Sequence, residues 1–474
     1  MTTFIIAKKE FKEIVRDGRF RWLSGVLLVL LLAALATGWQ YAEQAQNERE
    51  TAEKADRETW LAQGARNPHS AAHFGHYAFK PTPFLAYIDR GLNSFLGTAI
   101  WLEAHSQDPA GFRPAEDATS LQRFGDLTAA WTLQYLIPLF IIIMGFSAFA
   151  GEREQGTLKQ LKSLGLRSSQ LALGKTLGIG AALALALVPV TIVALALLGL
   201  SVNADSFPAI VPRLFGLGLI YTLYFIAFFS LTLAVSAKAK TPRLALLVLL
   251  GFWIGGGLLL PRLSADVAES VYPTPSITAF WEGVSTDVDE GLDGQTSRRQ
   301  RSEALQQRVL EQYGVDKVED LPVNYAGIRL QDSEEYSNLV FDKHYQQLWD
   351  TFTNQENLQA FASVLSPSIA VSAISRGFAG TDLHQHRHFA DAAELHRRKI
   401  VKILNDDLAE NGAEAGFGYM ADEKLWQDVP QIEYSSPSFS WVLSHYPLQL
   451  GILALWGVLS FMIMIRSVNN VRVV

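Results

Sequence analysis

Three closely spaced histidines are the residues of this sequence best suited to metal chemistry. His384, His386 and His388 alternate along the chain, with Asp382 and Asp391 close by. Neutral imidazole is a good ligand for zinc or copper, so three converging rings could hold one transition-metal ion. The simpler interpretation is the solvated start of a helix in which the histidines cap or pack. A His-rich tract is only a compositional indication of metal binding.

A second histidine group lies earlier in the chain. His69, His73 and His76 would share one face if this stretch were helical. Pro68 and Gly75 argue against a regular helix there. The spacing alone therefore does not predict a metal site in this group.

The stretch Ser169–Thr176 resembles the end of a phosphate-binding loop. Such a loop needs glycines so that backbone N–H groups can surround phosphate, but Ser169 replaces the first glycine and an apolar run follows. We expect no nucleotide site here, and we interpret Lys175 as the edge of a membrane span. The chain also has no cysteine and no convincing HExxH, GxSxG or SxxK motif, so an enzyme is not expected.

Any site must be positioned by the helices of the chain, and the clearest evidence for helices is a set of long uncharged runs. These runs cover 25 residues in Leu127–Gly151, 29 in Thr176–Ala204, 24 in Leu214–Ala237 and 25 in Trp441–Ile465. A membrane-spanning helix needs about 20 mostly apolar residues. Together with two shorter apolar runs, they predict six spans, at residues 22–40, 127–150, 176–201, 213–236, 244–261 and 441–465.

The charges of the connecting segments predict the orientation. Residues 1–21, 151–175, 237–243 and the tail 466–474 together carry 16 basic and 5 acidic residues. The long segments 41–126 and 262–440 carry 8 basic and 12 acidic, and 15 basic and 29 acidic residues. Because short cytoplasmic segments are rich in Lys and Arg, we expect both termini in the cytoplasm of a bacterium and the two long segments outside its inner membrane.

The long segments have a mostly helical pattern. Residues 42–63 prolong the first span outward, and one long helix has its apolar face at Phe389, Ala393, His396, Ile400, Leu404 and Leu408. The uncharged stretch Gly91–Leu102 is too short to span, and lies either on the membrane surface or in a domain core. The predicted fold class is an all-α membrane protein with six transmembrane helices, an N-terminal interfacial helix and a large, mostly helical extracytoplasmic domain built from two insertions.

Two cytoplasmic elements are predicted to be short amphipathic helices. In residues 1–21 an apolar stripe that includes Phe4, Ala7 and Phe11 lies opposite a polar side that includes Glu10, so this helix should lie flat on the lipid bilayer. In the link 151–175, acidic residues come first and lysines follow, which complements a helix dipole. This link could dock a cytoplasmic partner or be a solvated connector.

The spans themselves contain no Asp, Glu, Lys or Arg near their middle. Ion-driven transporters usually need such groups, so any energy for transport must come from elsewhere. Gly251 and Gly255 have GxxxG spacing, which suits either packing within the chain or a contact with a second subunit.

The link carries a family motif. The stretches Glu152-Arg-Glu-Gln-Gly-Thr-Leu, Leu161-Lys-Ser-Leu and Gly174-Lys175 resemble the signature of type-2 ABC exporter permeases, although a proline usual after the serine is absent. The openings Ala7-Lys-Lys-Glu-Phe-Lys and Arg16-Asp-Gly-Arg are also similar to that family. The two large insertions resemble a branch with big periplasmic domains, which includes gliding-motility-type and nitrous-oxide-reductase-maturation-type permeases.

The resemblance implies partners and contact residues. A separate cytoplasmic ABC ATPase dimer would hold ATP and Mg²⁺, so this chain needs no cofactor of its own, and a second permease subunit, identical or a sister protein, would complete the transporter. The resemblance places ATPase coupling on Glu152, Arg153, Glu154, Gly156, Thr157, Leu158 and Lys159. A second cytoplasmic contact would be made by Lys238, Lys240 and Arg243.

Three other functions are alternatives to a transporter permease. The chain could be a mechanotransmission subunit that moves periplasmic partners while nothing crosses the spans. It could be a membrane-anchored metal-handling or maturation factor that uses the histidines. It could be an exterior membrane enzyme, although no residues for one are found. A net charge of −7 and a pI near 5.8 argue against nucleic acid as a partner.

Overall fold

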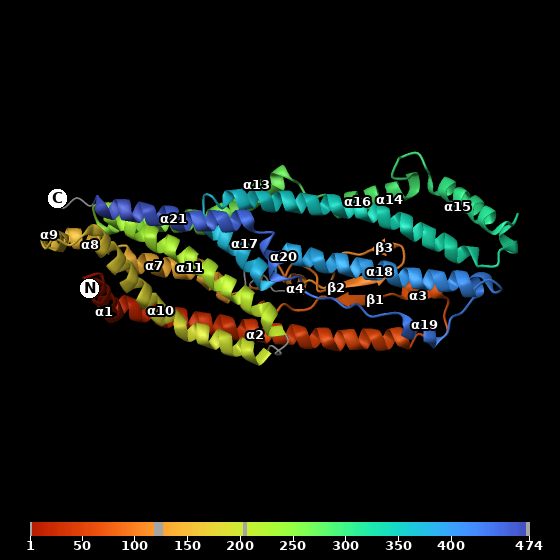
Figure 1. Cartoon of the computed structure of the whole chain (residues 1–474), viewed down its shortest axis with the longest axis horizontal. Helices are drawn as coiled ribbons and strands as arrows, with labels where there is room; N and C mark the ends of the chain where they lie inside the picture. The colour runs from red at the N-terminus through yellow and green to blue at the C-terminus, as the bar shows by residue number, and fades with distance from the viewer. Residues whose placement is uncertain (1, 118–126, 202–205, 471–474) are drawn as a thin grey trace.

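The computed structural model describes residues 2–117, 127–201 and 206–470. It is elongated, with both ends of the chain at one end of the long axis (Figure 1). A helical bundle forms that half of the molecule, and a mostly helical domain forms the other half. Residue 1, residues 118–126 of the first predicted insertion, residues 202–205 and residues 471–474, which include Arg472, lie outside the described residues.

Six helical stretches are long and apolar enough to cross a membrane, which confirms the predicted number of spans for the described residues. Two of them, the second and the fifth, are interrupted by π-helical turns, η1 and η3. The spans are α2 (Gly18–Leu61); α6 (Ala129–Trp131), η1 (Thr132–Leu136), α7 (Ile137–Gly145) and α8 (Ala150–Glu154); α10 (Ser168–Ser201); α11 (Phe207–Lys238); α12 (Pro242–Trp253), η3 (Ile254–Leu259) and α13 (Leu260–Val271); and α21 (Pro447–Asn469).

The predicted interfacial helix is α1 (Thr2–Arg16), and it packs across α10. Glycines on α10 allow the close approach, since a Cβ on Gly174 would lie 2.6 Å from the Ile6 side chain and one on Gly178 would lie 2.8 Å from the Ala7 carbonyl oxygen. Phe4 is 73% exposed and so lies on the outer surface rather than against the bundle. The buried apolar contact is made by Ala7 and its neighbours instead.

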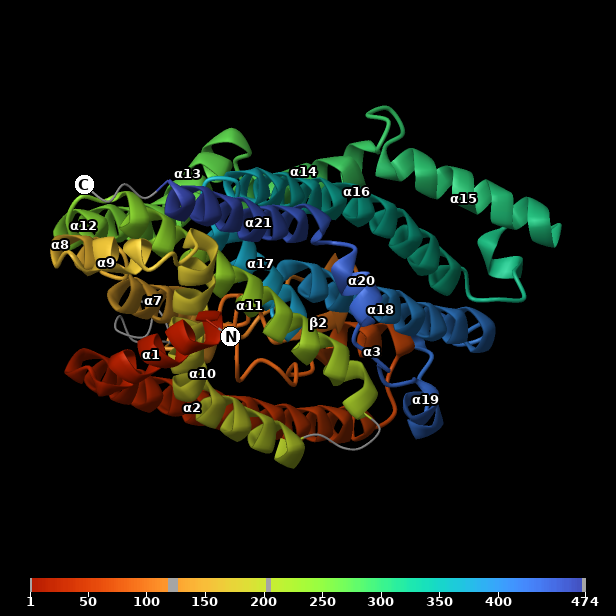
Figure 2. The ribbon, with the colours of Figure 1, turned by 60° about the vertical axis from the view of Figure 1, so that its left-hand side comes forward.

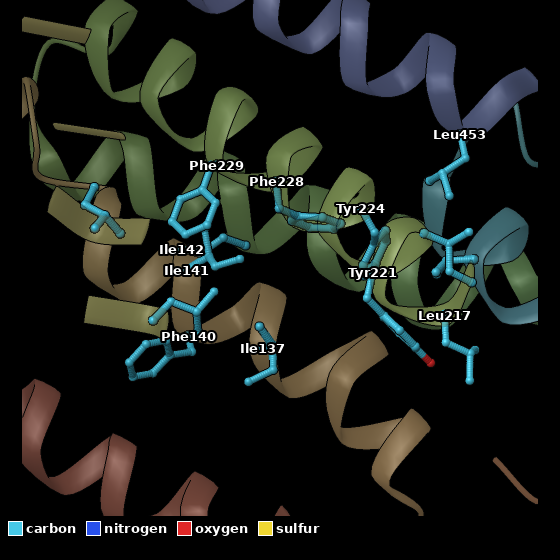
Figure 3. Packing of buried hydrophobic residues seen from close by; sticks show 14 of the residues in the cluster. Ile137, Phe140, Ile141, Ile142, Leu217, Tyr221, Tyr224, Phe228, Phe229 and Leu453 are labelled. Atoms are coloured by element: carbon cyan, nitrogen blue, oxygen red, sulfur yellow. The ribbon is translucent and has the colours of Figure 1, made fainter. Parts of the chain in front are cut away.

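The bundle core is built around α7, α11 and α21 (Figure 3). Side chains of Ile137, Ile141 and Phe229 are buried there, and Tyr224 donates a 2.7 Å hydrogen bond to the Gln134 carbonyl oxygen in η1. A π-helical turn disturbs the regular backbone hydrogen bonds, and inside a membrane the freed carbonyl groups need other donors. Tyrosine supplies one of these donors at η1.

Helix α17 (Pro367–Ala379), in the second predicted insertion, packs against the spans. It contacts both α11 and α21, and several of its side chains belong to the bundle core, which the sequence did not predict. Ser366 and Ser368 each donate a hydrogen bond to the Gly256 carbonyl oxygen in η3, at 2.7 and 2.9 Å. The fifth span likewise continues past residue 261, to Val271.

The other half of the molecule is a domain assembled from both insertions (Figures 1 and 2). Helix α2 runs from the bundle into it as one continuous helix, as predicted for residues 42–63. The remaining elements are α3 (Pro68–Phe74), β1 (His76–Phe79), β2 (Ala99–Glu103), β3 (Ser106–Gln107), α4 (Pro114–Asp117), α14 (Ile277–Glu290), α15 (Arg298–Tyr313), η4 (Val318–Asp320), α16 (Tyr325–Ala362), α18 (Leu383–Asn411), η5 (Gly416–Gly418), α19 (Glu423–Asp428) and α20 (Phe439–Leu443).

A small antiparallel sheet, in the order β1-β2-β3, is the feature of this domain that the sequence did not predict. His76 pairs with Leu102, and Tyr77 with Trp101. The second half of the stretch Gly91–Leu102 therefore belongs to the domain core, where Ile100 and Leu102 are buried. Strands of two to five residues are too short to show a clear alternation of apolar and polar side chains.

The long helix predicted around residues 389–408 is α18, and its predicted apolar face is buried against the rest of the domain. The histidine stretch before β1 is helical, which corrects the expectation of an irregular segment. Pro68 is the first residue of α3 and Gly75 is its C-cap, so the two residues mark the ends of the helix instead of breaking it.

Candidate functional site

The buried ammonium group of Lys175 connects three elements at the end of the bundle that carries the termini. Its Nζ lies 2.6 Å from Glu10 Oε1 on α1 and 2.9 Å from Glu152 Oε1 on α8, and its side chain is 2% exposed. The ring of Phe149 lies 5.5 Å from the same nitrogen. Lys175 belongs to α10, so one side chain holds α1 and α8 against the third span.

Arg153 connects α8 to the end of the fourth span. Its guanidinium donates hydrogen bonds to the carbonyl oxygens of Ala237, at 2.6 Å, and Ala239. These carbonyls end α11, where a cation complements the helix dipole. The Ser236 hydroxyl accepts hydrogen bonds from the backbone N–H groups of Phe149 and Ala150, at 3.0 and 3.2 Å. Four hydrogen bonds therefore fix the start of α8 to α11, of which Arg153 donates two and Ser236 accepts two.

The chain turns a corner between α8 and α9 (Thr157–Ser163). Gly156 has φ +77°, a left-handed backbone that favours glycine, although a Cβ added there would meet no heavy atom beyond its chain neighbours within 4 Å. Thr157 Oγ1 donates a 3.2 Å hydrogen bond back to the Glu152 carbonyl oxygen. Leu158 is 1% exposed and packs into the bundle core, which anchors the second helix of the corner.

The seven residues predicted for coupling therefore divide by direction. Glu152, Arg153 and Leu158 point inward and fasten the corner. Glu154 and Lys159 are exposed and point away from the bundle, as do their neighbours Gln155 and Gln160. The outward set, with the exposed Gly156 between its members, is the part of the corner that could contact another protein without rearrangement.

The second predicted contact lies beside the first. Lys238, Lys240 and Arg243 are all exposed, in the turn between α11 and α12. The turn is held near α8 by a small cluster of buried alanines that contains Ala150 and Ala239. Figure 2 shows α8, α9 and the start of α12 together at the end of the bundle. The exposed cations and the α8–α9 corner thus form one continuous end surface.

Comparison with known sequence families decides the class of protein. Residues 86–271, which contain the second to fifth spans and the α8–α9 corner, match the family described as ABC-2 family transporter protein. Residues 86–271 therefore belong to the ABC-2 transporter family. Residues 279–435 match a family described as a domain of unknown function, DUF3526. No curated protein matches the chain.

This match confirms the resemblance that the Glu152-Arg-Glu-Gln-Gly-Thr-Leu motif indicated. The match supports an ABC transporter permease, a component of membrane transport. It also implies association with an ABC ATPase and a membrane. Sequence reasoning missed the inward partners of the motif: Glu10 has the spacing of a solvated residue of α1, and only the tertiary contact with Lys175 shows its role.

The structure separates the three histidines that were predicted as metal ligands in the permease. His384 Nε2 lies 3.2 Å from Glu356 Oε2, and its ring packs against His445. His388 Nδ1 lies 3.1 Å from the Tyr434 hydroxyl. His386 is buried and lines a cavity of about 320 Å³ with aromatic side chains of β2 and α16. Within the described residues these three rings therefore have three different environments.

A different group of histidines in the permease could hold a metal ion. His69 and His73 on α3 and His105 after β2 each offer a ring nitrogen, and these nitrogens lie within 4.8 Å of one another. The spacing of His69 and His73 indicated a shared helical face. No local signal points to His105, because strand pairing brings it to α3.

Proposed function

We propose that this permease couples ATP hydrolysis in a separate cytoplasmic ATPase dimer to movement of its own spans. That movement would export a substrate or change the conformation of the outer domain.

 

The observation that carries this proposal is the division of the α8–α9 corner into an outward and an inward side. The outward side presents Glu154 and Lys159 to a partner. The inward side is fastened to α1 and α10 through Lys175, and to α11 through Arg153. A force that the ATPase applies to the outward side would therefore act on several spans at once.

The exposed turn between α11 and α12 is proposed as the second ATPase contact. Lys238, Lys240 and Arg243 lie beside the corner and are free of the apolar packing that holds Ala239. Their positive charge would complement an acidic patch on the ATPase, which would mainly steer association and fix its orientation.

We propose a bacterial inner membrane as the location, with both termini in the cytoplasm. The bundle end that carries α1, α8 and α9 is the end with the excess of Lys and Arg, which supports this orientation. The DUF3526 region would then form most of the periplasmic domain.

A path of buried polar contacts leads from the spans to the outer domain. The Tyr221 hydroxyl on α11 lies 2.9 Å from Ser375 Oγ on α17, and Ser375 donates a 2.5 Å hydrogen bond to Asp89 Oδ2. Nearer the domain, Arg213 donates hydrogen bonds to Gln385 Oε1 at 3.1 Å and to the Pro437 carbonyl oxygen at 2.7 Å. Movement of α11 would therefore displace α17 and α18 as well.

This path and the continuous helix α2 favour a second candidate function, a mechanotransmission subunit. In this case ATP hydrolysis would move the outer domain and a periplasmic partner while nothing crosses the spans. Both candidate functions use the same ATPase contact. They differ in whether a substrate crosses the spans.

A second permease subunit is proposed to complete the transporter, and α12 offers a surface for it. A Cβ added to Gly251 or Gly255 would meet no heavy atom within 4 Å, whereas one on Gly256 would meet Ser366 and one on Gly257 would meet Tyr135. The GxxxG face formed by Gly251 on α12 and Gly255 on η3 is therefore open, and small residues allow two helices to approach closely in a membrane.

Cysteine cross-linking tests the proposed ATPase contact directly, because the natural chain has no cysteine. Single cysteines at Glu154 and Lys159 should cross-link to the ATPase encoded with this permease, and a cysteine at Gln295, on the outer domain, is the matched control. Cross-linking at Gln295 but not at the corner would contradict the proposal.

A further inference from the structure

A compact histidine cluster in the outer domain has no role in the proposed coupling. His69 and His73 are one helical turn apart on α3, and His105 lies in the turn between β2 and β3. The ring centroids of His69 and His73 are 4.7 Å apart, and each lies 5.1 Å from that of His105. Three rings from two separate elements thus converge on one point.

The nitrogens of the cluster are close enough for shared coordination. His69 Nε2 and His105 Nε2 lie 3.4 Å apart, and one nitrogen from each of the three rings falls within 4.8 Å of the others. Two nitrogens bound at about 2.0–2.1 Å to a tetrahedral zinc ion are roughly 3.4 Å apart. The first pair already has this separation, and rotation of the exposed His73 side chain would bring in the third.

A buried carboxylate orients the third ring. Glu334 Oε1 lies 2.5 Å from His105 Nδ1 and accepts a 2.7 Å hydrogen bond from the His105 backbone N–H. Glu334 is 2% exposed, and Arg397 Nη1 holds its other oxygen at 3.2 Å. A carboxylate that accepts from one ring nitrogen leaves the other free to bind a metal, which is the usual outer support of a metal-binding histidine.

The backbone of His105 also indicates a built site. Its φ is +65°, in the left-handed region that costs a non-glycine residue free energy. Such strain persists only where the surroundings impose it, and here both contacts with Glu334 do so.

A ring nitrogen of the cluster also lacks a partner. His69 Nδ1 is buried without a hydrogen-bond partner in the described part of the chain.

We propose that His69, His73 and His105 bind one late first-row divalent metal ion, with zinc as the expected occupant. Three neutral imidazoles suit such an ion, and because no fourth ligand joins them among the described residues, one coordination position is left for solvent or a ligand. The site would join α3 to the β2–β3 turn and, through Glu334, to α16. Metal binding would therefore stabilise the outer domain against unfolding.

The test uses the full-length permease without a histidine tag, purified in detergent and stripped with a chelator. Titration with Zn²⁺ alone should give one tight equivalent, and Co²⁺ should give the visible absorption of a tetrahedral site. His73→Ala and His105→Asn should each weaken Zn²⁺ binding at least 100-fold. Asn is chosen at position 105 because it tolerates the left-handed backbone.

Glu334→Gln should weaken Zn²⁺ binding about 10- to 100-fold, as expected for an outer-shell partner. The matched control is the triple variant His384→Ala, His386→Ala, His388→Ala, which should bind Zn²⁺ as the natural chain does. Circular dichroism without metal checks that each variant is folded. The proposal is overturned if the natural chain binds no stoichiometric Zn²⁺, if folded His73→Ala binds it equally well, or if only the triple variant loses it.

Discussion

Lys175 Nζ on α10 lies 2.6 Å from Glu10 Oε1 on α1, in a position where the lysine side chain is 2% exposed. Removing charged groups from water costs several kcal/mol per ion, so a buried pair is favourable only when its geometry and its other contacts compensate. Here Glu152 supplies a second carboxylate at 2.9 Å. The two ion pairs of Lys175 therefore join α1, the third span and the α8–α9 corner into one unit.

Removal of the lysine should destabilise this unit strongly. In Lys175→Met, two partly buried carboxylates lose their nearest cation and keep only the half-exposed Lys9, whose Nζ lies 4.0 Å from Glu10 Oε1 and 3.9 Å from Glu152 Oε1. Breaking a buried pair costs about 3–5 kcal/mol, and Lys9 would offset part of that loss. We expect a clear fall in the thermal unfolding midpoint of the purified permease. A triple variant, Lys175→Met with Glu10→Gln and Glu152→Gln, should recover part of the loss. Equal midpoints for the natural chain and Lys175→Met would show that the contact contributes nothing to stability.

Charge reversal on the outward side of the corner should affect coupling and leave stability unchanged. Glu154 and Lys159 are exposed, and surface substitutions usually change stability by less than about 0.5 kcal/mol. Glu154→Lys with Lys159→Glu should therefore keep the unfolding midpoint but reduce the ATPase activity of the assembled transporter several-fold. Gln346→Glu on α16, in the outer domain, is the control. Undiminished ATP hydrolysis in the double variant would remove these residues from the contact.

The sequence predicted the membrane part of the fold well because long uncharged runs have few alternatives to spanning helices. It did not predict that α17 enters the bundle. This helix has 13 residues, too few to be recognised as a span, and its entry depends on small contacts such as Gly377 against the Tyr446 ring. Such contacts exist only after distant segments have come together.

The candidate site was also predicted only in part, because some of its contacts join segments that are distant in the sequence. The family motif identified the α8–α9 corner, but it could not separate Glu152, which binds Lys175, from Glu154, which is exposed. The histidines show in addition that closeness in the sequence does not predict contact in the fold. His384 and His388 are close in sequence but have different partners, whereas His69 and His105 are 36 positions apart and lie in contact.

The proposed orientation can be measured with single cysteines in the naturally cysteine-free chain. Leu164, at the corner, is 76% exposed, and Gln295 is exposed on the outer domain. In intact spheroplasts a membrane-impermeant maleimide should label Gln295→Cys and not Leu164→Cys. After permeabilisation both should be labelled. The reverse pattern in intact spheroplasts would invert the topology and exclude the corner as a cytoplasmic contact.

Two buried histidines should make the outer domain sensitive to acid. His76 packs edge-on against Trp60, and its ring lies 6.0 Å from that of His396. Burial lowers the pKa of His76 from 6.5 to about 3 and that of His396 to about 4. Below pH 6.5 the unfolded chain therefore binds protons that the folded domain does not, and the free energy of unfolding decreases as the pH falls from 6.5 toward 3–4.

The decrease should approach about 1.4 kcal/mol per pH unit for each histidine within that window. His76→Phe removes one titrating group and keeps an aromatic ring beside Trp60, so its unfolding midpoint should change less between pH 7 and pH 4.5 than that of the natural chain. Chemical denaturation at both pH values, with chelator present, measures the difference. A His76→Phe variant that loses as much stability as the natural chain would show that this histidine is not the source of the acid sensitivity.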